Sequence, residues 1–148
     1  MKWPLVLAGF LALLTATGTV QALDYGSVAN QSAILYDAPS LKARKLYVVS
    51  RYMPLERVVI LSDWIKVRDQ SGSLAWIEKQ ALSSKRYVVV SVALADVRQA
   101  PDTQAALAFK ARKQVALEWL ESTGTGWIKV RHTDGATGYI KAIDVWGD

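Results

Sequence analysis

The sequence contains no cysteine and only one histidine, His132. The missing thiols exclude disulfides, thiolate metal sites and a cysteine nucleophile, and one imidazole cannot supply the usual zinc ligand set. His132 lies just before a predicted turn, a position typical of a solvated loop residue. Carboxylates such as Asp37 and Glu56 have no spacing that indicates a shared cleft for glycoside hydrolysis. We therefore expect a protein that is not an enzyme and that uses no metal and no cofactor.

Blocks of like charge are also missing, although the formal net charge is +5. Lysine and arginine occur as single residues or as pairs that are spread along the whole chain. Scattered charge of this kind is typical of a solvated, mixed surface. The sequence therefore gives no reason to expect a nucleic-acid partner.

Long apolar runs are absent except at the N-terminus, where residues 5–14 are uninterruptedly apolar and follow Lys2. The compact residues Val20 and Ala22 then predict a secretory signal peptide over residues 1–22, cleaved after Ala22. An uncleaved membrane anchor is the alternative, but a spanning helix needs about 20 apolar residues and this run is shorter. We expect the mature protein to be periplasmic or secreted, with no attachment to the membrane after cleavage.

A duplication organises the rest of the chain. The pentapeptide Trp-Ile-Lys-Val-Arg occurs at residues 64–68 and again, unchanged, at residues 127–131. The two pentapeptides are 63 positions apart, whereas Ala38-Pro39 and Ala100-Pro101 are 62 positions apart. This difference predicts a single extra residue in the second copy, within the loop 122–126. Two units of about 63 residues follow, small domains that can fold alone. We expect them at residues 23–82 and 87–148, with residues 83–86 as the linker.

Both units have the patterns of β-strands. In the second unit Val115, Leu117 and Trp119 alternate with more polar residues, as do Ile128 and Val130. Ser71-Gly72 and Asp134-Gly135 each predict a hairpin after the repeated pentapeptide. Residues 103–113 are rich in Ala, Lys and Arg, but their counterpart 41–52 favours strand, so we predict a loop followed by a strand in both.

The order of these signals resembles the bacterial SH3-like, or SH3b, domain family. Each unit has a proline-marked loop, two strands, a Trp-x-Lys-Val motif, a tight turn and a small-aromatic-Ile motif at residues 75–77 or 138–140. The first unit adds Met53-Pro54-Leu55, and the second ends on Val145-Trp146-Gly147. The resemblance implies an all-β chain with two tandem, five-stranded, partly open barrels. It also implies a binding module, of a family whose ligands include peptidoglycan and other proteins.

Residues 138–145 also resemble the eukaryotic SH3 signature at their first three positions and at the last. Lys141 and Asp144 stand where that signature has the proline and tyrosine of the polyproline groove, and Glu78 and Ala81 replace them in the first unit. A proline-rich peptide is therefore not the expected ligand.

The candidate binding residues lie on one side of the repeated pentapeptide. Because side chains alternate along a strand, the tryptophans should share a partly exposed face with lysine and arginine, opposite the isoleucines and valines. An indole beside cations suits the sugars and acidic peptides of the cell wall. The alternative is that these tryptophans close their own barrels or the contact between barrels. The candidates are Trp64, Lys66, Arg68, Trp127, Lys129 and Arg131.

The other aromatic residues are better explained by packing. Trp76 and Tyr139 follow the small residues Ala75 and Gly138, where a closely packed aromatic is expected. Trp119 and Trp146 are typical of core or inter-domain packing. Two functional hypotheses remain: an exported module that binds peptidoglycan or its stem peptides, or a scaffolding subunit that docks on another envelope protein.

Overall fold

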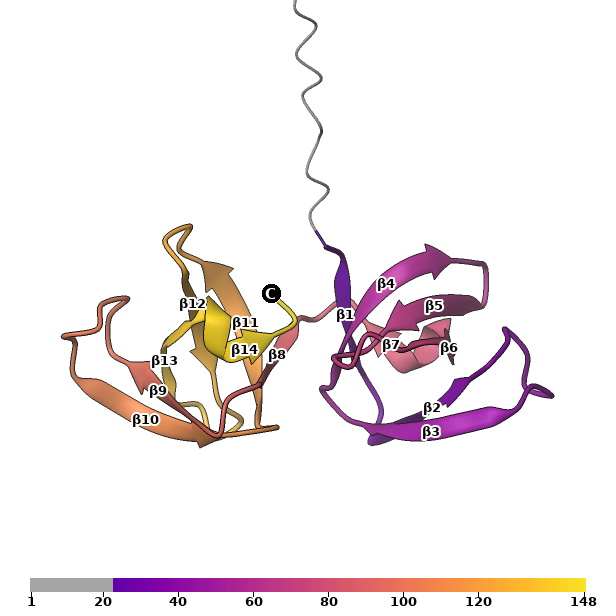
Figure 1. Cartoon of the computed structure of the whole chain (residues 1–148), viewed down its shortest axis with the longest axis horizontal. Coiled ribbons are helices and arrows are strands. Elements are labelled where there is room, and N and C mark those ends of the chain that lie inside the picture. The colour runs from indigo at the N-terminus through magenta and orange to yellow at the C-terminus, as the bar shows by residue number, and fades with distance from the viewer. Residues whose placement is uncertain (1–22) are drawn as a thin grey trace, which may run out of the picture.

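The computed structural model describes residues 23–148 as two antiparallel β-sheets, which Figure 1 shows side by side. We name β1–β7 domain 1 and β8–β14 domain 2. The predicted signal peptide, residues 1–22, lies outside the described residues. Within the described range the helices are short 3-10 turns, and none is long and apolar enough to cross a membrane.

Domain 1 consists of seven strands and one 3-10 helix. In chain order they are β1 (Tyr25–Val28), β2 (Ser32–Tyr36), β3 (Lys45–Ser50), β4 (Pro54–Ile60), β5 (Trp64–Arg68), β6 (Leu74–Glu78), η1 (Lys79–Ala81) and β7 (Leu82–Ser83). Their order in the sheet is β3-β2-β6-β5-β4-β1-β7.

Domain 2 repeats this arrangement element by element. Its elements are β8 (Tyr87–Val90), β9 (Leu94–Arg98), β10 (Leu107–Arg112), β11 (Ala116–Ser122), β12 (Trp127–Arg131), β13 (Thr137–Lys141), η2 (Ala142–Asp144) and β14 (Val145–Trp146). The order β10-β9-β13-β12-β11-β8-β14 is the same topology.

The predicted all-β architecture of two tandem units is confirmed. Each sheet holds seven strands where the resemblance implies five, because both arms of the proline-marked loop pair as strands and a two-residue strand closes each domain. The extra residue of the second copy lies where it was predicted, since residues 61–63 join β4 to β5 and residues 123–126 join β11 to β12. The segments 41–52 and 103–113 are each a loop followed by a strand, as predicted.

Each domain has its own core, built by strand alternation. On β5 the side chains of Ile65 and Val67 are buried, while the residues between them face outward and are half-buried. Complete burial of a large aliphatic side chain stabilises the fold by about 1.5–3 kcal/mol. The largest fully buried side chains are Leu35, Leu55 and Ile77 in domain 1 and Leu117, Ile128 and Ile140 in domain 2.

The predicted hairpins join β5 to β6 and β12 to β13. Gly72 and Gly135 have φ values of +87° and +93°, which glycine adopts without steric cost. In domain 1 the carboxylate of Asp69 accepts hydrogen bonds from the backbone N–H groups of Ser71 and Ser73, at 2.9 and 3.0 Å. These bonds stabilise the turn that joins β5 to β6.

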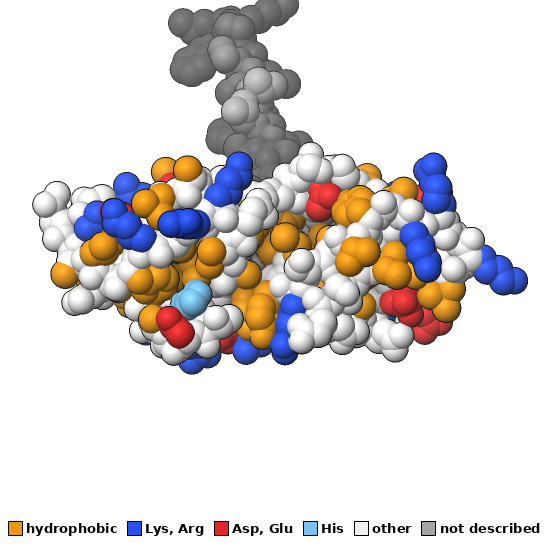
Figure 2. Space-filling view, turned by 90° about the horizontal axis from the view of Figure 1, so that it is seen from below, with side chains coloured by type: hydrophobic (Ala, Val, Ile, Leu, Met, Phe, Trp, Pro, Cys, Tyr) orange, Lys and Arg blue, Asp and Glu red, His pale blue; other side chains and the backbone are white. Residues whose placement is uncertain are grey.

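The two domains touch along a seam made of aromatic pairs. The rings of Tyr25 and Trp146 meet edge to face with centroids 5.2 Å apart, and those of Tyr52 and Tyr87 stack at 4.3 Å. The Tyr87 backbone N–H donates a 3.0 Å hydrogen bond to Oγ of Ser27, whose exposed fraction is only 2%. Figure 2 shows hydrophobic side chains at several places on the molecule's underside, including the middle, where the domains meet. Trp146 therefore packs between the domains, as predicted.

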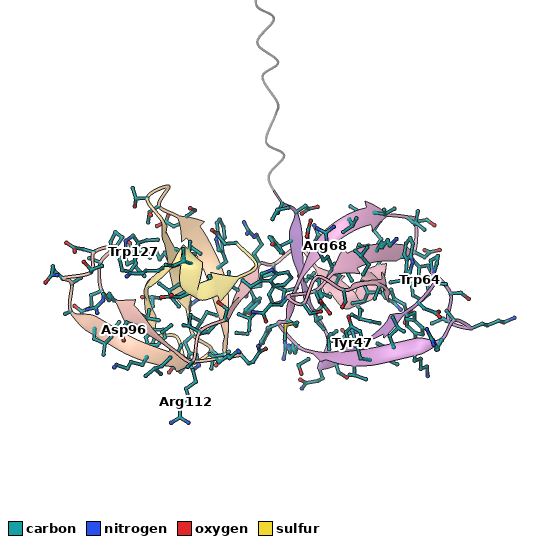
Figure 3. The ribbon with its side chains drawn as sticks, in the orientation of Figure 1. Tyr47, Trp64, Arg68, Asp96, Arg112 and Trp127 are labelled. Atoms are coloured by element: carbon teal, nitrogen blue, oxygen red, sulfur yellow. The ribbon has the colours of Figure 1, made fainter. Side chains whose placement is uncertain are left out.

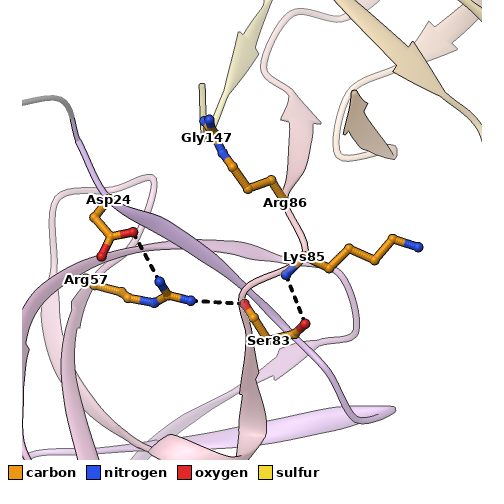
Figure 4. A network of polar contacts seen from close by, with 6 residues as sticks. All are labelled: Asp24, Arg57, Ser83, Lys85, Arg86 and Gly147. Atoms are coloured by element: carbon orange, nitrogen blue, oxygen red, sulfur yellow. Dashed lines mark hydrogen bonds and ion pairs between the residues drawn. The ribbon is translucent and has the colours of Figure 1, made fainter. Parts of the chain in front are cut away.

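The linker is held by hydrogen bonds at both of its ends (Figure 4). The Arg57 guanidinium donates to the Ser83 carbonyl at 3.3 Å and to Asp24 at 3.1 Å. Arg86 donates to the Gly147 carbonyl at 3.0 Å. Ser83, which we predicted as the first linker residue, belongs to β7 and pairs with Ser27 of β1. Residues 84–86 alone therefore connect the strands of the two domains.

Candidate functional site

An open groove of about 670 Å³ lies beside Trp64 in domain 1. Trp64 begins β5 and is paired in register with Glu78, the last residue of β6, so both side chains lie at the same end of the sheet. The proline-marked loop and η1 complete the walls. We name this the domain 1 groove, and its lining residues are Leu41, Ser62, Asp63, Trp64, Glu78, Lys79 and Gln80.

Trp64 is held in place by a buried tyrosine. The ring of Tyr36, at the end of β2, is 4% exposed and meets the indole edge to face, with centroids 5.3 Å apart and an angle of 88° between the planes. Aromatic pairs in this arrangement contribute about 0.5–1.5 kcal/mol beyond their buried area. The indole is therefore a fixed wall of the groove before any ligand arrives.

Domain 2 has a smaller groove of about 360 Å³ at the equivalent place, beside Trp127. Arg98 stands where domain 1 has Tyr36, and its guanidinium donates 2.8 Å hydrogen bonds to the Ala105 carbonyl and to Asp96. Lys141, paired in register with Trp127, places its Nζ 6.0 Å from the centre of the indole. We name this the domain 2 groove, and its lining residues are Leu94, Asp96, Arg98, Thr103, Lys110, Trp127, Lys141 and Asp144.

The two grooves face away from the seam. Figure 3 shows Trp64 near the outer end of domain 1 and Trp127 near the outer end of domain 2, on opposite sides of the molecule. The seam separates them, so the described chain offers two separate grooves.

Two segments of the chain match a model of the bacterial SH3 domain, residues 29–84 and residues 91–147. The chain belongs to the bacterial SH3 domain family. Each match covers all but the first strand of one seven-stranded sheet, so the protein has two tandem SH3-like domains. The resemblance seen in the sequence is thereby confirmed.

Solved structures similar to this tandem SH3 chain include two proteins from Trichomonas vaginalis, NlpC1 and NlpC2. NlpC1 is 18% identical with a TM-score of 0.39, over 95% of this chain and 51% of its own. NlpC2 is 17% identical with a TM-score of 0.40, over 88% and 50%. An NlpC/P60 family protein from Bacillus cereus ATCC 10987 is 13% identical with a TM-score of 0.37, over 82% and 55%. The tandem SH3 chain thus spans about half the length of each of these proteins. No curated protein matches it in sequence.

The outward face predicted for β5 of SH3 domain 1 is present, but its residues do not converge on one site. Trp64 lines the groove, whereas Lys66 places its Nζ 5.9 Å from the ring centre of Trp76. Arg68 forms a 2.9 Å ion pair with Glu56 on β4. Figure 3 shows Trp64 at the outer end of the domain and Arg68 near the seam, so the row runs away from the groove.

SH3 domain 2 repeats this division of roles on β12. Lys129 lies 6.0 Å from the ring centre of Tyr139, and Arg131 forms a 3.0 Å ion pair with Glu118. The hydrogen bond from Arg131, together with Lys85 at 3.2 Å, lowers the pKa of Glu118 below its ordinary value. Both arginines of the predicted face are thus engaged by glutamates, which leaves the tryptophans and lysines to meet a ligand.

Sequence reasoning did not place the loop and turn residues that complete the SH3 grooves. Leu41, Asp63 and Lys79 line the domain 1 groove from three different connecting segments. No periodic pattern marks such residues, because their position depends on how each loop folds over the sheet. Glu78 and Lys141 did carry a signal, since each is the residue that replaces the signature proline.

His132 lies apart from both grooves. Its Nδ1 is 3.0 Å from the Asp134 carboxylate, and its ring centre is 6.0 Å from that of Phe109. The side chain is 36% exposed, in keeping with the predicted position beside a turn. Across residues 23–148, no three His, Cys, Asp or Glu side chains are grouped so that they would hold a metal ion.

Proposed function

We propose that this protein is an exported, non-enzymatic binding protein of the bacterial envelope, and that its two grooves bind peptidoglycan or its stem peptides. The observation that carries the proposal is the groove itself, built twice around a tryptophan that begins the repeated pentapeptide. Family membership and the predicted signal peptide support a role at the cell wall.

The chemistry of the grooves suits such a ligand. A fixed indole offers a flat apolar surface for a sugar ring or a peptide plane, and charged side chains stand within reach of it. Glu78 is paired in register with Trp64, and Lys141 with Trp127. Cell-wall peptides carry both carboxylates and amines, so each groove has a charged group to offer to them.

The test is sedimentation with isolated sacculi. Protein lacking residues 1–22 should co-sediment, and Trp64→Ala combined with Trp127→Ala should abolish this while the circular dichroism spectrum stays unchanged. The control is Val58→Ala with Leu120→Ala, which removes apolar side chains at equivalent positions of β4 and β11 outside the grooves. A wild type that stays in the supernatant overturns the proposal.

Two further measurements complete the test. Lys66→Ala with Lys129→Ala shows whether the lysines of the pentapeptide take part, and a reduction of binding without a loss of folding assigns them to the site.

The sequence has one histidine and no cysteine, which supports a role without catalysis. Release of soluble muropeptides by the pure protein contradicts that part of the proposal.

One feature of domain 1 favours the alternative, a scaffolding subunit that docks on another envelope protein. On the edge strand β3 the side chains of Leu46 and Val48 are 38% and 65% exposed, whereas domain 2 has Ala108 and Lys110 at the equivalent positions. Exposed apolar residues on an edge strand are typical of a protein contact. An affinity pull-down from envelope extracts that yields a stoichiometric partner, without sacculus binding, would support this second function.

A further inference from the structure

The two grooves differ in the charge that stands beside the indole. Glu78 is paired in register with Trp64, and Lys141 occupies the equivalent position opposite Trp127. Directly opposed residues of an antiparallel pair have Cβ atoms about 4.5–5.5 Å apart. Each tryptophan therefore has a half-buried charge as its neighbour, negative in domain 1 and positive in domain 2.

Neither of these charges is neutralised within the described part of the chain. Glu78 accepts one hydrogen bond, from the amide of Gln80 at 3.0 Å, and forms no ion pair across residues 23–148. Lys141 forms none either, although its ammonium lies 6.0 Å from the centre of the Trp127 ring. Both groups are available to a ligand that rests on the indole.

The remaining charges on the walls reinforce the difference. In the domain 1 groove Asp63 adds a second carboxylate, and Lys79 is the one cation among the lining residues. In the domain 2 groove Arg98 and Lys110 join Lys141, and these three cations outnumber the two carboxylates of the lining, Asp96 and Asp144. The carboxylate of Asp96 forms ion pairs with Arg98 at 2.8 Å and with Lys110 at 3.7 Å.

The strand pair next to each groove, β2 and β3 in domain 1 and β9 and β10 in domain 2, also differs in charge between the domains. Ile34 and Val48 face each other across β2 and β3, and the equivalent pair across β9 and β10 is Asp96 and Lys110. Domain 1 therefore offers an apolar surface near its acidic groove, which suits the aliphatic stem of an amine-bearing side chain. In domain 2 the equivalent residues line the groove and form a 3.7 Å ion pair, so this groove has no such apolar surface beside it.

We infer that the two grooves select oppositely charged groups: the domain 1 groove takes a ligand with an ammonium group on an aliphatic stem, and the domain 2 groove takes a ligand with a carboxylate. The inference rests on the proposed function, because it assumes that the grooves are the binding sites, and it assigns a different ligand chemistry to each. Glu78 and Lys141 are the residues that determine the choice.

Each groove contains one tryptophan, and this makes the inference testable site by site. The probes are three peptides that differ at one position: acetyl-Ala-Lys-Ala-amide, acetyl-Ala-Glu-Ala-amide and the neutral acetyl-Ala-Gln-Ala-amide. The readout is the indole N–H resonance in a nitrogen-15 correlation spectrum of residues 23–148, which include both sheets. Trp64→Phe and Trp127→Phe assign the two signals.

The lysine peptide should shift the Trp64 signal, and the glutamate peptide should shift the Trp127 signal. A hydrogen bond to a charged group at a partly buried site is worth about tenfold in affinity, so the neutral peptide should bind each groove about tenfold more weakly. Raising the salt from about 50 to about 500 mM should reduce the difference, because the charges are partly exposed.

Charge reversal then tests the two named residues. Glu78→Lys should move the preference of the domain 1 groove to the glutamate peptide, and Lys141→Glu should move that of the domain 2 groove to the lysine peptide. The matched controls are Glu121→Lys and Lys113→Glu, which reverse exposed charges outside the grooves and should change neither preference. A well-dispersed spectrum shows that each variant is folded.

The outcomes separate this inference from the proposed function. Equal shifts of both indoles by both charged peptides, unchanged by either reversal, overturn the charge selectivity, while sacculus binding by the same protein leaves the proposed function standing. Site-specific shifts without sacculus binding support the selectivity and overturn peptidoglycan as the ligand. No shift with any peptide, in a protein that sediments with sacculi, also overturns the selectivity.

Discussion

Removal of one hydroxyl group at the seam should weaken the contact between the domains. Oγ of Ser27 accepts the hydrogen bond from the Tyr87 backbone N–H at 3.0 Å, and Ser27 is 2% exposed. In Ser27→Ala the N–H of Tyr87 remains buried without a partner, which costs about 1–3 kcal/mol. For a domain of about 60–100 residues each kcal/mol lowers the melting temperature by about 4–8 °C. We expect a decrease of about 4–24 °C.

Differential scanning calorimetry measures this effect and also its location. Because Ser27 belongs to domain 1 and Tyr87 to domain 2, the lost bond reduces the coupling between them, so a single transition in the wild type should broaden or separate into two. Ser50→Ala is the matched control, since Ser50 is exposed on β3. The reasoning is refuted if Ser27→Ala melts at the same temperature and with the same profile as Ser50→Ala.

Two further predictions concern stability. In Gly138→Ala the new Cβ would lie 2.6 Å from Cγ1 of Val97 and 2.8 Å from the Arg98 carbonyl oxygen, so domain 2 should lose about 1–3 kcal/mol in urea unfolding, and an unchanged midpoint would contradict this. The lowered pKa of Glu118 means that its ion pairs stabilise the fold above its ordinary value of 4.5 and that this stability is lost as the pH falls through the lowered pKa. Below about pH 4.5 the melting temperature should therefore fall more steeply in the wild type than in Glu118→Gln, whereas Glu121→Gln should keep the wild-type slope.

The duplication made much of the fold predictable from the sequence. Two copies of one motif fixed the number of domains, the position of the extra residue and the outward face of β5 and β12. Alternation placed Ile65 and Val67 in the core, because a strand has only two faces. The same argument correctly put Trp64 and Trp127 on the outside.

The partners of the two arginines were not predictable by counting residues. Continued pairing from the turn between β4 and β5 would place Arg57 opposite Arg68. A β-bulge between Arg57 and Val59 shifts the register by one residue and brings Glu56 opposite Arg68 instead. Domain 2 has the corresponding bulge, and it brings Glu118 opposite Arg131. Nothing in the sequence pattern marks a bulge, so the arginines could not be separated from the binding candidates in advance.

The residues that line the grooves could not be predicted from the sequence either, for a different reason. Their walls come from a sheet edge, a proline-marked loop and a 3-10 turn that lie far apart in the chain. The contrast between Glu78 and Lys141 is visible in the sequence, but its meaning requires their pairing with Trp64 and Trp127.

Under the proposed function, the seam between the domains affects how firmly the protein would bind a surface with repeated ligands. A short ligand that fills one groove cannot reach the other, so the second groove must engage a second copy of the ligand or a different one. Simultaneous engagement raises avidity only when the copies are spaced to match the separation of the grooves, because a rigid connection cannot adjust to other distances. If the grooves bind as proposed, the protein therefore selects the spacing of its ligands as well as their chemistry.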